Sequence, residues 1–365
     1  MNTIGNNIKI TVFGQSHAEA IGVTIDGLPA GTLIDEEYVQ NVLDLRAPGK
    51  SDTATKRKEP DKVQFVSGVV DGKTVGTSIC AVIFNTDQRS KDYSNLIGKP
   101  RPSHADYPAM VKYGDSFVIR GGGQFSGRLT APICIAGAIA LKLLEDKGIK
   151  IACHIKSVGN ISDTGFDTLE NQDELMDKLN TMSFAVIDEQ KGVEMHDLIK
   201  NAFNNCDSVG GVIECKITGM PVAVGNPMFD GIENAISRMI FGVPAVKGIE
   251  FGAGFEGSSL FGSQYNDAYY YDENGIVRTK TNNAGGIVGG MSTGMPIIFR
   301  AAMKPTPSIA QKQDTVNLIT KQNDTIEIHG RHDPCIVPRA NVVIRAATAL
   351  AILDLMSSEE LGVRS

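Results

Sequence analysis

The residues best suited to chemistry lie between Arg101 and Thr130, where a histidine and an acid precede a run of three glycines. His104 and Asp106 come first, and the glycines at 121–123 follow, with one arginine before them and another after them. Consecutive glycines leave backbone N–H groups bare, so that a ligand can approach them closely. Arginine binds phosphate or carboxylate through two hydrogen bonds. The stretch therefore predicts an anion-binding loop with a titratable group beside it.

A second candidate is the polar turn that holds Ser16 and His17, between two predicted strands at 8–13 and 20–25. A serine and a histidine at a strand end are well placed to face a pocket. Histidine titrates near neutrality without any perturbation, which suits it to proton transfer. A solvated turn histidine is the alternative interpretation.

Two further segments carry groups of the same kind. The turn at 304–308 offers a lysine and two hydroxyls on a proline-stiffened backbone, which suits a phosphate, although such a turn often binds nothing. The segment 329–335 packs two histidines, an arginine and Asp333 together. A metal site is the competing interpretation there, but Arg331 would place a cation beside the ion, and Asp333 precedes a proline.

Period-two alternation and helical spacing predict the elements that must hold these groups. The polar segment 85–93 follows a predicted strand and reads as a charged surface loop, or alternatively as a substrate lid or subunit contact. Further strands are expected at 63–70, 77–84, 149–158, 210–219 and 295–303, and helices at 35–45, 129–144, 228–241 and 341–356, with weaker helical character over 163–206.

Composition narrows the class of protein. The net charge of -7 over 365 residues argues against broad nucleic-acid binding. No signal peptide and no unbroken apolar run of membrane-spanning length is evident, so we expect no membrane association. Six scattered cysteines without CxxC spacing indicate free thiols in a reducing cytoplasm. The absence of a linker predicts a single domain over 1–365, and the glycines at 281–294 do not form the GxGxxG pattern of a dinucleotide site.

Seven separated motifs carry a resemblance. In chain order they are GQSHAEAIGVTIDGLPAG (14–31), NTDQRSKDYS (85–94), RPSHADY (101–107), GGGQFSGRLT (121–130), NNAGGIVGGMSTG (282–294), KPTPSI (304–309) and GRHDPCIVPRA (330–340). Together they resemble the chorismate synthase family over nearly the whole chain. Seven motifs in the family's order are far more specific than any one of them.

The resemblance implies a fold, a reaction and partners. The implied fold is α+β, a β-α-β sandwich with central helices between antiparallel sheets, assembled as a homotetramer. The implied reaction is a lyase reaction of the shikimate pathway, the 1,4-anti-elimination of phosphate and a proton from 5-enolpyruvylshikimate 3-phosphate to give chorismate. It uses reduced FMN without net redox change. NADPH would then act only indirectly, through an external flavin reductase.

The resemblance also implies roles for individual residues. His17, His104 and Asp333 match the family's proton-transfer positions: His17 and Asp333 beside the flavin, and His104 near the leaving phosphate. The implied substrate contacts are Ser16, Arg46, Arg128 and Arg331. The implied flavin contacts are Gln124, Phe125, Ser126, Ala245, Gly289, Lys304, Pro305, Thr306, Pro307, Ser308 and Arg331. No metal site is implied.

The sequence departs from the family's usual pattern at several positions. The family usually has an arginine where Gln124 stands and a glutamate where Leu129 stands. The loss of both is consistent with a compensated ion-pair exchange that leaves the charge of the pocket balanced. Other departures are Phe125, Leu45, Ala47, Asp52 and Arg345. They favour one alternative, a catalytically impaired family member that binds an aromatic-pathway metabolite. A flavin reductase is a separate alternative, which the missing GxGxxG pattern weakens.

Overall fold

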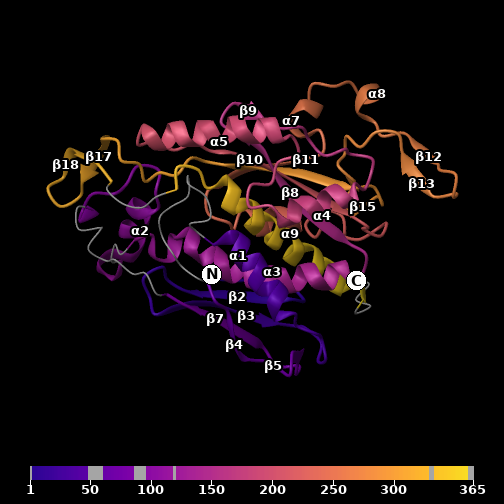
Figure 1. Cartoon of the computed structure of the whole chain (residues 1–365), viewed down its shortest axis with the longest axis horizontal. Coiled ribbons are helices and arrows are strands. Elements are labelled where there is room, and N and C mark those ends of the chain that lie inside the picture. The colour runs from indigo at the N-terminus through magenta and orange to yellow at the C-terminus, as the bar shows by residue number, and fades with distance from the viewer. Residues whose placement is uncertain (1, 48–60, 86–95, 118–120, 329–332, 361–365) are drawn as a thin grey trace.

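The computed structural model describes residues 2–47, 61–85, 96–117, 121–328 and 333–360. Two antiparallel sheets enclose a layer of helices, as predicted (Figure 1). One sheet has the strand order β1 (Thr3–Ile4), β2 (Lys9–Gly14), β3 (Ala20–Asp26), β7 (Ile79–Phe84), β4 (Gln64–Ser67). The other has the order β11 (Val246–Phe251), β16 (Ile297–Met303), β10 (Gly211–Thr218), β8 (Lys150–Val158), β9 (Ile161–Ser162).

Helices fill the space between the sheets and cover one outer face. The central layer holds α1 (Glu36–Arg46), α3 (Thr130–Glu145), α6 (Ile232–Ile240) and α9 (Val337–Glu360). Two more helices, α4 (Asp173–Thr181) and α5 (Glu189–Asn204), lie on the outer side of the second sheet (Figure 1). The predicted α+β sandwich is therefore confirmed.

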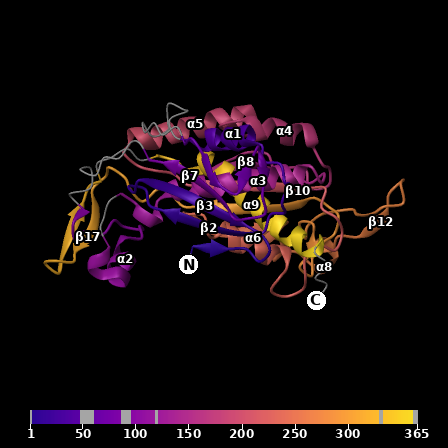
Figure 2. The same ribbon diagram turned by 90° about the horizontal axis from the view of Figure 1, so that it is seen from below.

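Smaller elements project at the two ends of the sandwich (Figure 2). At one end α2 (Asp106–Tyr113) lies near the hairpin β17 (Gln313–Asn317) and β18 (Gln322–Ile326). At the other end β12 (Tyr269–Tyr271) and β13 (Val277–Thr279) form an arm beyond the short helices α7 (Gly254–Gly257) and α8 (Gly262–Tyr265). The remaining short elements are β5 (Val69–Val70) with β6 (Lys73–Thr74), β14 (Ile287–Val288) with β15 (Met291–Ser292), and the 3₁₀ turns 114–116, 123–125 and 127–129.

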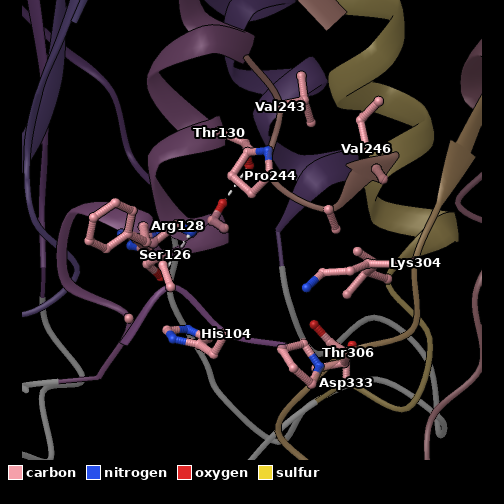
Figure 3. Close-up of a pocket in the computed structure, with 18 of the residues that line it drawn as sticks. His104, Ser126, Arg128, Thr130, Val243, Pro244, Val246, Lys304, Thr306 and Asp333 are labelled. Carbon is pink, nitrogen blue, oxygen red and sulfur yellow. Dashed lines mark hydrogen bonds between the residues drawn. The ribbon is translucent and has the colours of Figure 1, made fainter. Parts of the chain in front are cut away.

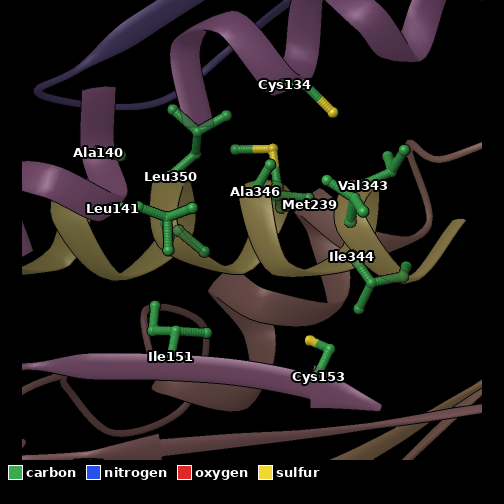
Figure 4. Close-up of a cluster of buried hydrophobic side chains, with 14 of the residues drawn as sticks. Cys134, Ala140, Leu141, Ile151, Cys153, Met239, Val343, Ile344, Ala346 and Leu350 are labelled. Atoms are coloured by element: carbon green, nitrogen blue, oxygen red, sulfur yellow. The ribbon is translucent and has the colours of Figure 1, made fainter. Parts of the chain in front are cut away.

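The central helices are apolar because both sheets press on them. Leu141 of α3 and Leu350 of α9 lie in one buried cluster, and Ile151 of β8 faces α9 from below (Figure 4). Gly137 allows α3 and α9 to approach closely, since a Cβ there would lie 2.4 Å from the Ala346 Cβ. Close packing of this kind is the main source of the fold's stability.

Two helical stretches have the length and hydropathy of membrane spans, 127–145 and 337–357. Both stretches were predicted as helices but not as candidate membrane spans, because neither is an unbroken run of apolar residues. In the fold, 72% and 83% of their respective windows are buried inside the protein. Burial between two sheets explains their apolar character.

The predicted element types are confirmed, with shifted boundaries. The helix expected at 228–241 begins only at Ile232, because Met228 adopts a positive φ of 67° and Gly231 is extended at the N-cap. The weakly helical region 163–206 divides into α4 and α5. The elements that were not predicted from the sequence include α2, the β12–β13 arm, the β17–β18 hairpin and the edge strands β1 and β11.

A buried charged cluster ties the outer helices to the second sheet. His154 on β8 is fully buried, with its Nδ1 3.3 Å from Asp163 Oδ2 and its Nε2 3.0 Å from Glu214 Oε2. Asp163 also accepts the backbone N–H groups of Ile187 and Asp188, at the start of α5. Burial alone would lower the pKa of His154, but the two carboxylates outweigh burial and raise it above 6.5.

This cluster predicts a pH-dependent stability. Because the folded-state pKa of His154 lies above the unfolded value, the stabilisation by the imidazolium is complete below about pH 6.5 and is lost as the pH rises through the folded pKa. His154→Gln should lower the free energy of unfolding by about 3 kcal/mol at pH 6 and by less at pH 9. Urea unfolding of both proteins at the two pH values measures the difference. An equal loss at both would contradict a charged His154.

Candidate functional site

A cavity of about 730 Å³ opens where the central helices meet the ends of the strands. Its wall combines the last residue of α1, the start of α3, the start of α9 and the turn 241–247 between α6 and β11. These predicted site residues line it: Ser16, His17, Arg46, His104, Gln124, Phe125, Ser126, Arg128, Ala245, Lys304, Thr306, Pro307, Ser308 and Asp333. Segments far apart in the sequence therefore meet in one place.

Three predicted contacts are not among the described residues that line this cavity. Gly289 lies in the β14–β15 turn, beside a second cavity of about 430 Å³ lined in part by Ile287 and Val288. Arg331 lies outside the described residues, as does Asp52. Pro305 sits between two lining residues but does not itself line the wall.

His17 is held by its own turn and by the glycine run. Its Nδ1 is 3.0 Å from Ser16 Oγ, and the Ser16 backbone N–H donates to the Gly123 carbonyl at 3.2 Å. Gly121 has a φ of +68°, and a Cβ there would lie 2.3 Å from His17 Cε1. The first glycine of the run is therefore required both by the backbone conformation and by the space that the imidazole occupies.

His104 is held by a buried ion pair. Its Nδ1 lies 2.7 Å from Asp106 Oδ1, and the other oxygen, Oδ2, accepts Arg101 Nε at 2.7 Å. Burial would raise the pKa of Asp106, but hydrogen bonds from Arg101 and His104 outweigh it and hold the pKa well below its usual range. Arg101 also donates to the Gly121 carbonyl at 3.2 Å. The two histidine turns are thus joined through the glycine run.

Two of the predicted arginines converge on one buried acid, Asp61. Arg46 Nη1 lies 2.8 Å from Asp61 Oδ2, and Arg128 Nη1 pairs with Asp61 Oδ1. Arg46 also donates from Nε to Thr130 Oγ1 at 3.2 Å and from Nη2 to the Gly127 carbonyl at 2.9 Å. Burial lowers the pKa of Arg46 to about 10, and the charge of Arg339 acts in the same direction.

Asp333 pairs with an arginine that the sequence argument did not single out. Arg339 Nη1 forms an ion pair with Asp333 Oδ2, and Arg339 Nε donates to the Arg46 carbonyl at 3.1 Å. Arg339 therefore links Asp333 to the Arg46 cluster. Both Asp333 and Arg339 line the cavity.

The opposite side of the cavity holds a second group of cations. Figure 3 shows Lys304, Thr306 and Asp333 facing His104 and Arg128 across the cavity. Burial lowers the pKa of Lys304, and the charge of Lys247 lowers it further. The Thr306 hydroxyl is buried without a hydrogen-bond partner among the described residues. Two repelling lysines beside an unsatisfied hydroxyl fit an anionic group such as a phosphate.

An apolar strip runs between the two charged sides. It is formed by Val243 and Pro244 from the turn after α6 and by Val246 at the start of β11 (Figure 3). Ile336, just before α9, and Ala340 and Val343 in its first turns complete it. A strip of this kind suits a flat, largely apolar ring system, while the charged ends fix its orientation.

Sequence reasoning missed several residues that complete the site. Arg101 and Asp106 belong to the motif RPSHADY (101–107), but the sequence did not reveal that they hold His104 in position. Lys247 and the apolar strip carried no motif that could reveal them. Asp61 lay in a charged stretch that resembled a solvated loop, and Arg339 lay just past the last histidine cluster.

Comparisons with known proteins agree in one family. A family model described as chorismate synthase matches residues 8–357. The chorismate synthase of Methanococcus aeolicus is 45% identical over 364 residues, covering 98% of this chain and 97% of the relative. That of Methanosphaera stadtmanae is 46% identical over 355 residues, covering 97% and 96%. A crystal structure of chorismate synthase superposes with a TM-score of 0.76 at 26% identity, covering 98% of this chain and 94% of that chain.

The contact between Gly121 and His17 gives a matched test. Gly121→Ala must move the imidazole, because a Cβ would overlap it, whereas Gly123 has a similar positive φ of +53° but open space around a Cβ. Each substitution should cost about 1 kcal/mol through backbone strain, but only Gly121→Ala should shift the NMR signals of the His17 ring. Equal shifts in both variants would contradict the described contact.

Proposed function

The chain belongs to the chorismate synthase family of carbon–oxygen lyases, and we propose that it converts 5-enolpyruvylshikimate 3-phosphate to chorismate. The reaction removes phosphate and a proton from the substrate, with reduced FMN bound beside it and no net redox change. The observation that carries the proposal is the convergence of His17, His104 and Asp333 on one cavity with several cations. Such a cavity fits a substrate that bears two carboxylates and a phosphate.

We place the substrate at the arginine side of the cavity. Ser16, Arg128 and the more deeply buried Arg46 would form its anion-binding wall. Arg331 stays a proposed substrate contact by its motif alone, because it lies outside the described residues. His104 would hold a proton at the leaving phosphate. Its bond to Asp106 fixes the direction of the ring, so that Nε2 is the atom left to meet the ligand.

Reduced FMN fits the remaining wall. Its ring system would lie along the apolar strip, beside Ala245, and its phosphate would bind at Lys304–Ser308, where Lys247 adds charge and Thr306 offers an unsatisfied hydroxyl. The proposed contacts further include Gln124, Phe125 and Ser126, with Pro305 and Pro307 stiffening the turn. When bound, reduced flavin supplies the electron-rich ring that assists loss of the phosphate.

The protein's own residues would then control protons, orientation and water. His17, fixed by Ser16, would hold a proton at the flavin, and Asp333, fixed by Arg339, would help to take up the substrate's proton from beside the flavin. Two imidazoles and one carboxylic acid are the kinds of group that an elimination with proton transfer needs. Gly289 remains a proposed flavin contact by its motif alone.

We also propose the wider setting of the enzyme as one domain over 1–365. It would act as a homotetramer in the cytoplasm and receive reduced flavin from an external reductase, so that NADPH acts only indirectly. Exposed aromatic side chains on and beside the β12–β13 arm support a self-association surface, with Phe255 83%, Phe261 78% and Tyr271 76% exposed. Free cysteines support a reducing compartment.

An anaerobic assay tests the reaction itself. Purified protein with dithionite-reduced FMN and 5-enolpyruvylshikimate 3-phosphate should produce chorismate, measured by its absorbance, and should produce none with oxidised FMN. A folded protein that gives no chorismate under these conditions would contradict the proposed activity.

The same assay tests the proposed proton carriers. His104→Ala and Asp333→Asn should each slow turnover by about 100-fold or more, because each removes a positioned proton-transfer group. Asp314→Asn is the control, since Asp314 is an exposed aspartate on β17. Rates near wild type in the first two variants would contradict these roles.

Flavin affinity tests the lysine side of the cavity. Lys304→Met should weaken FMN binding by about tenfold, because a charge-assisted hydrogen bond to the phosphate is lost, and Lys247→Met should weaken it less. Lys312→Met is the control, because Lys312 is exposed and does not line the cavity. Flavin fluorescence quenching gives the dissociation constants. If the dissociation constant for FMN is the same in all three variants, the flavin phosphate does not bind at these lysines.

A further inference from the structure

Asp61 occupies an unusual position behind the wall of the cavity. Its side chain is fully buried and does not line the cavity, yet each of its oxygens receives a different guanidinium group. Oδ2 accepts Arg46 and Oδ1 accepts Arg128, both of which do line the cavity. Among the residues that the structure describes, the carboxylate can therefore act on a ligand only through these two arginines.

The hydrogen bonds around Asp61 fix both guanidinium planes. Arg128 Nε donates to Asn85 Oδ1 at 3.0 Å while its Nη1 pairs with Asp61, so two donors of one group are anchored on different segments. Arg46 is anchored in the same way, by Asp61, Thr130 and the Gly127 carbonyl. An amide at position 61 would turn its oxygen to one arginine and its NH2 group, which donates and does not accept hydrogen bonds, to the other.

The backbone of Asp61 adopts an unfavourable conformation, which the surrounding contacts must stabilise. Its φ is +45°, in a region that residues other than glycine rarely adopt. Gln40 holds the segment, because its Nε2 donates to the Asp61 carbonyl at 3.4 Å and its Oε1 accepts the Val63 N–H at 3.3 Å. Strained residues of this kind tend to occur where a functional geometry must be kept.

The charges explain why an anion is needed at this point. Arg46, Arg128 and Arg339 lie near one another at the wall, and their mutual repulsion opposes their gathering there. Without a compensating carboxylate, the arginine side chains would separate or turn toward solvent. A fixed internal anion keeps them together when no ligand is bound.

We propose that Asp61 is a positioning residue, which holds Arg46 and Arg128 in their ligand-binding geometry before the anionic substrate arrives. This inference rests on the proposed function, because it assigns the two arginines to the substrate side of the cavity. Asp61 touches neither substrate nor flavin. Its effect is on the affinity and orientation of the substrate rather than on proton transfer.

Steady-state kinetics of the flavin-loaded enzyme test this role with two variants. Asp61→Asn removes the charge, and Asp61→Glu keeps it but displaces the carboxylate by one methylene. Each should raise the KM for 5-enolpyruvylshikimate 3-phosphate by about tenfold or more, because small misplacements of binding groups are costly. The dissociation constant for FMN should change by less than about twofold, since the flavin phosphate is placed at the other side.

Asp163→Asn is the matched control, because Asp163 is also a buried aspartate in an ion pair but lies in the His154 cluster, away from the cavity. It should lower the unfolding temperature and leave the KM unchanged. If Asp61→Asn does not fold, Asp61→Glu decides the question. A folded Asp61 variant with a wild-type KM, or a change no larger than that of Asp163→Asn, would overturn the positioning role alone. A wild-type enzyme that neither binds nor converts the substrate would overturn the proposed function as well.

Discussion

A single buried carboxylate shared by two guanidinium groups holds the functional end of this protein together. Asp61 joins the last residue of α1 to the turn that begins α3, and Arg339 extends the connection to α9 through the Arg46 carbonyl. Three central helices therefore meet at one polar junction. Removing one partner from such a buried pair typically costs about 3–5 kcal/mol, because the remaining charge is left uncompensated.

The position of the cavity follows from the layered fold. Between the sheets the helices bury apolar surface on all sides, so that no room remains for a polar ligand. Where α1 ends and α3 and α9 begin, the apolar layer gives way to backbone N–H groups, arginines and glycine. The apolar strip at the start of α9 continues the core into the cavity, and the ion pairs form its rim. The same helices thus supply both the stability of the fold and the shape of the site.

The sequence predicted the parts of this arrangement that depend on local pattern. Glycine runs, histidines at strand ends and apolar helices are visible within short windows, and most of the residues that the family resemblance implied as site residues line one cavity. The contacts between charged residues far apart in the sequence could not be predicted in this way. Asp61 lies 67 residues from Arg128, and Arg339 lies 293 residues from Arg46, so only the folded chain brings them together.

The departures from the family pattern also become understandable only in the structure. Leu45 and Leu129 pack against the main hydrophobic core, where a charged side chain would need a partner. Gln124 is exposed at the rim of the cavity, and Arg345 donates to the Asn180 carbonyl without lining the cavity. None of these residues takes part in the described ion pairs of Asp61. Projecting features such as the β12–β13 arm lacked any periodic signal, because their aromatic side chains are exposed rather than packed.

The central claim is that one cavity holds the phosphorylated substrate on its arginine side and the flavin along its apolar strip. A crystal structure of the protein with oxidised FMN and 5-enolpyruvylshikimate 3-phosphate tests it most directly. We predict substrate density against Arg128 and His104, and flavin density along Val243–Val246 with its phosphate at Lys304. Density for either molecule outside this cavity, or a substrate that contacts none of these cations, would contradict the account.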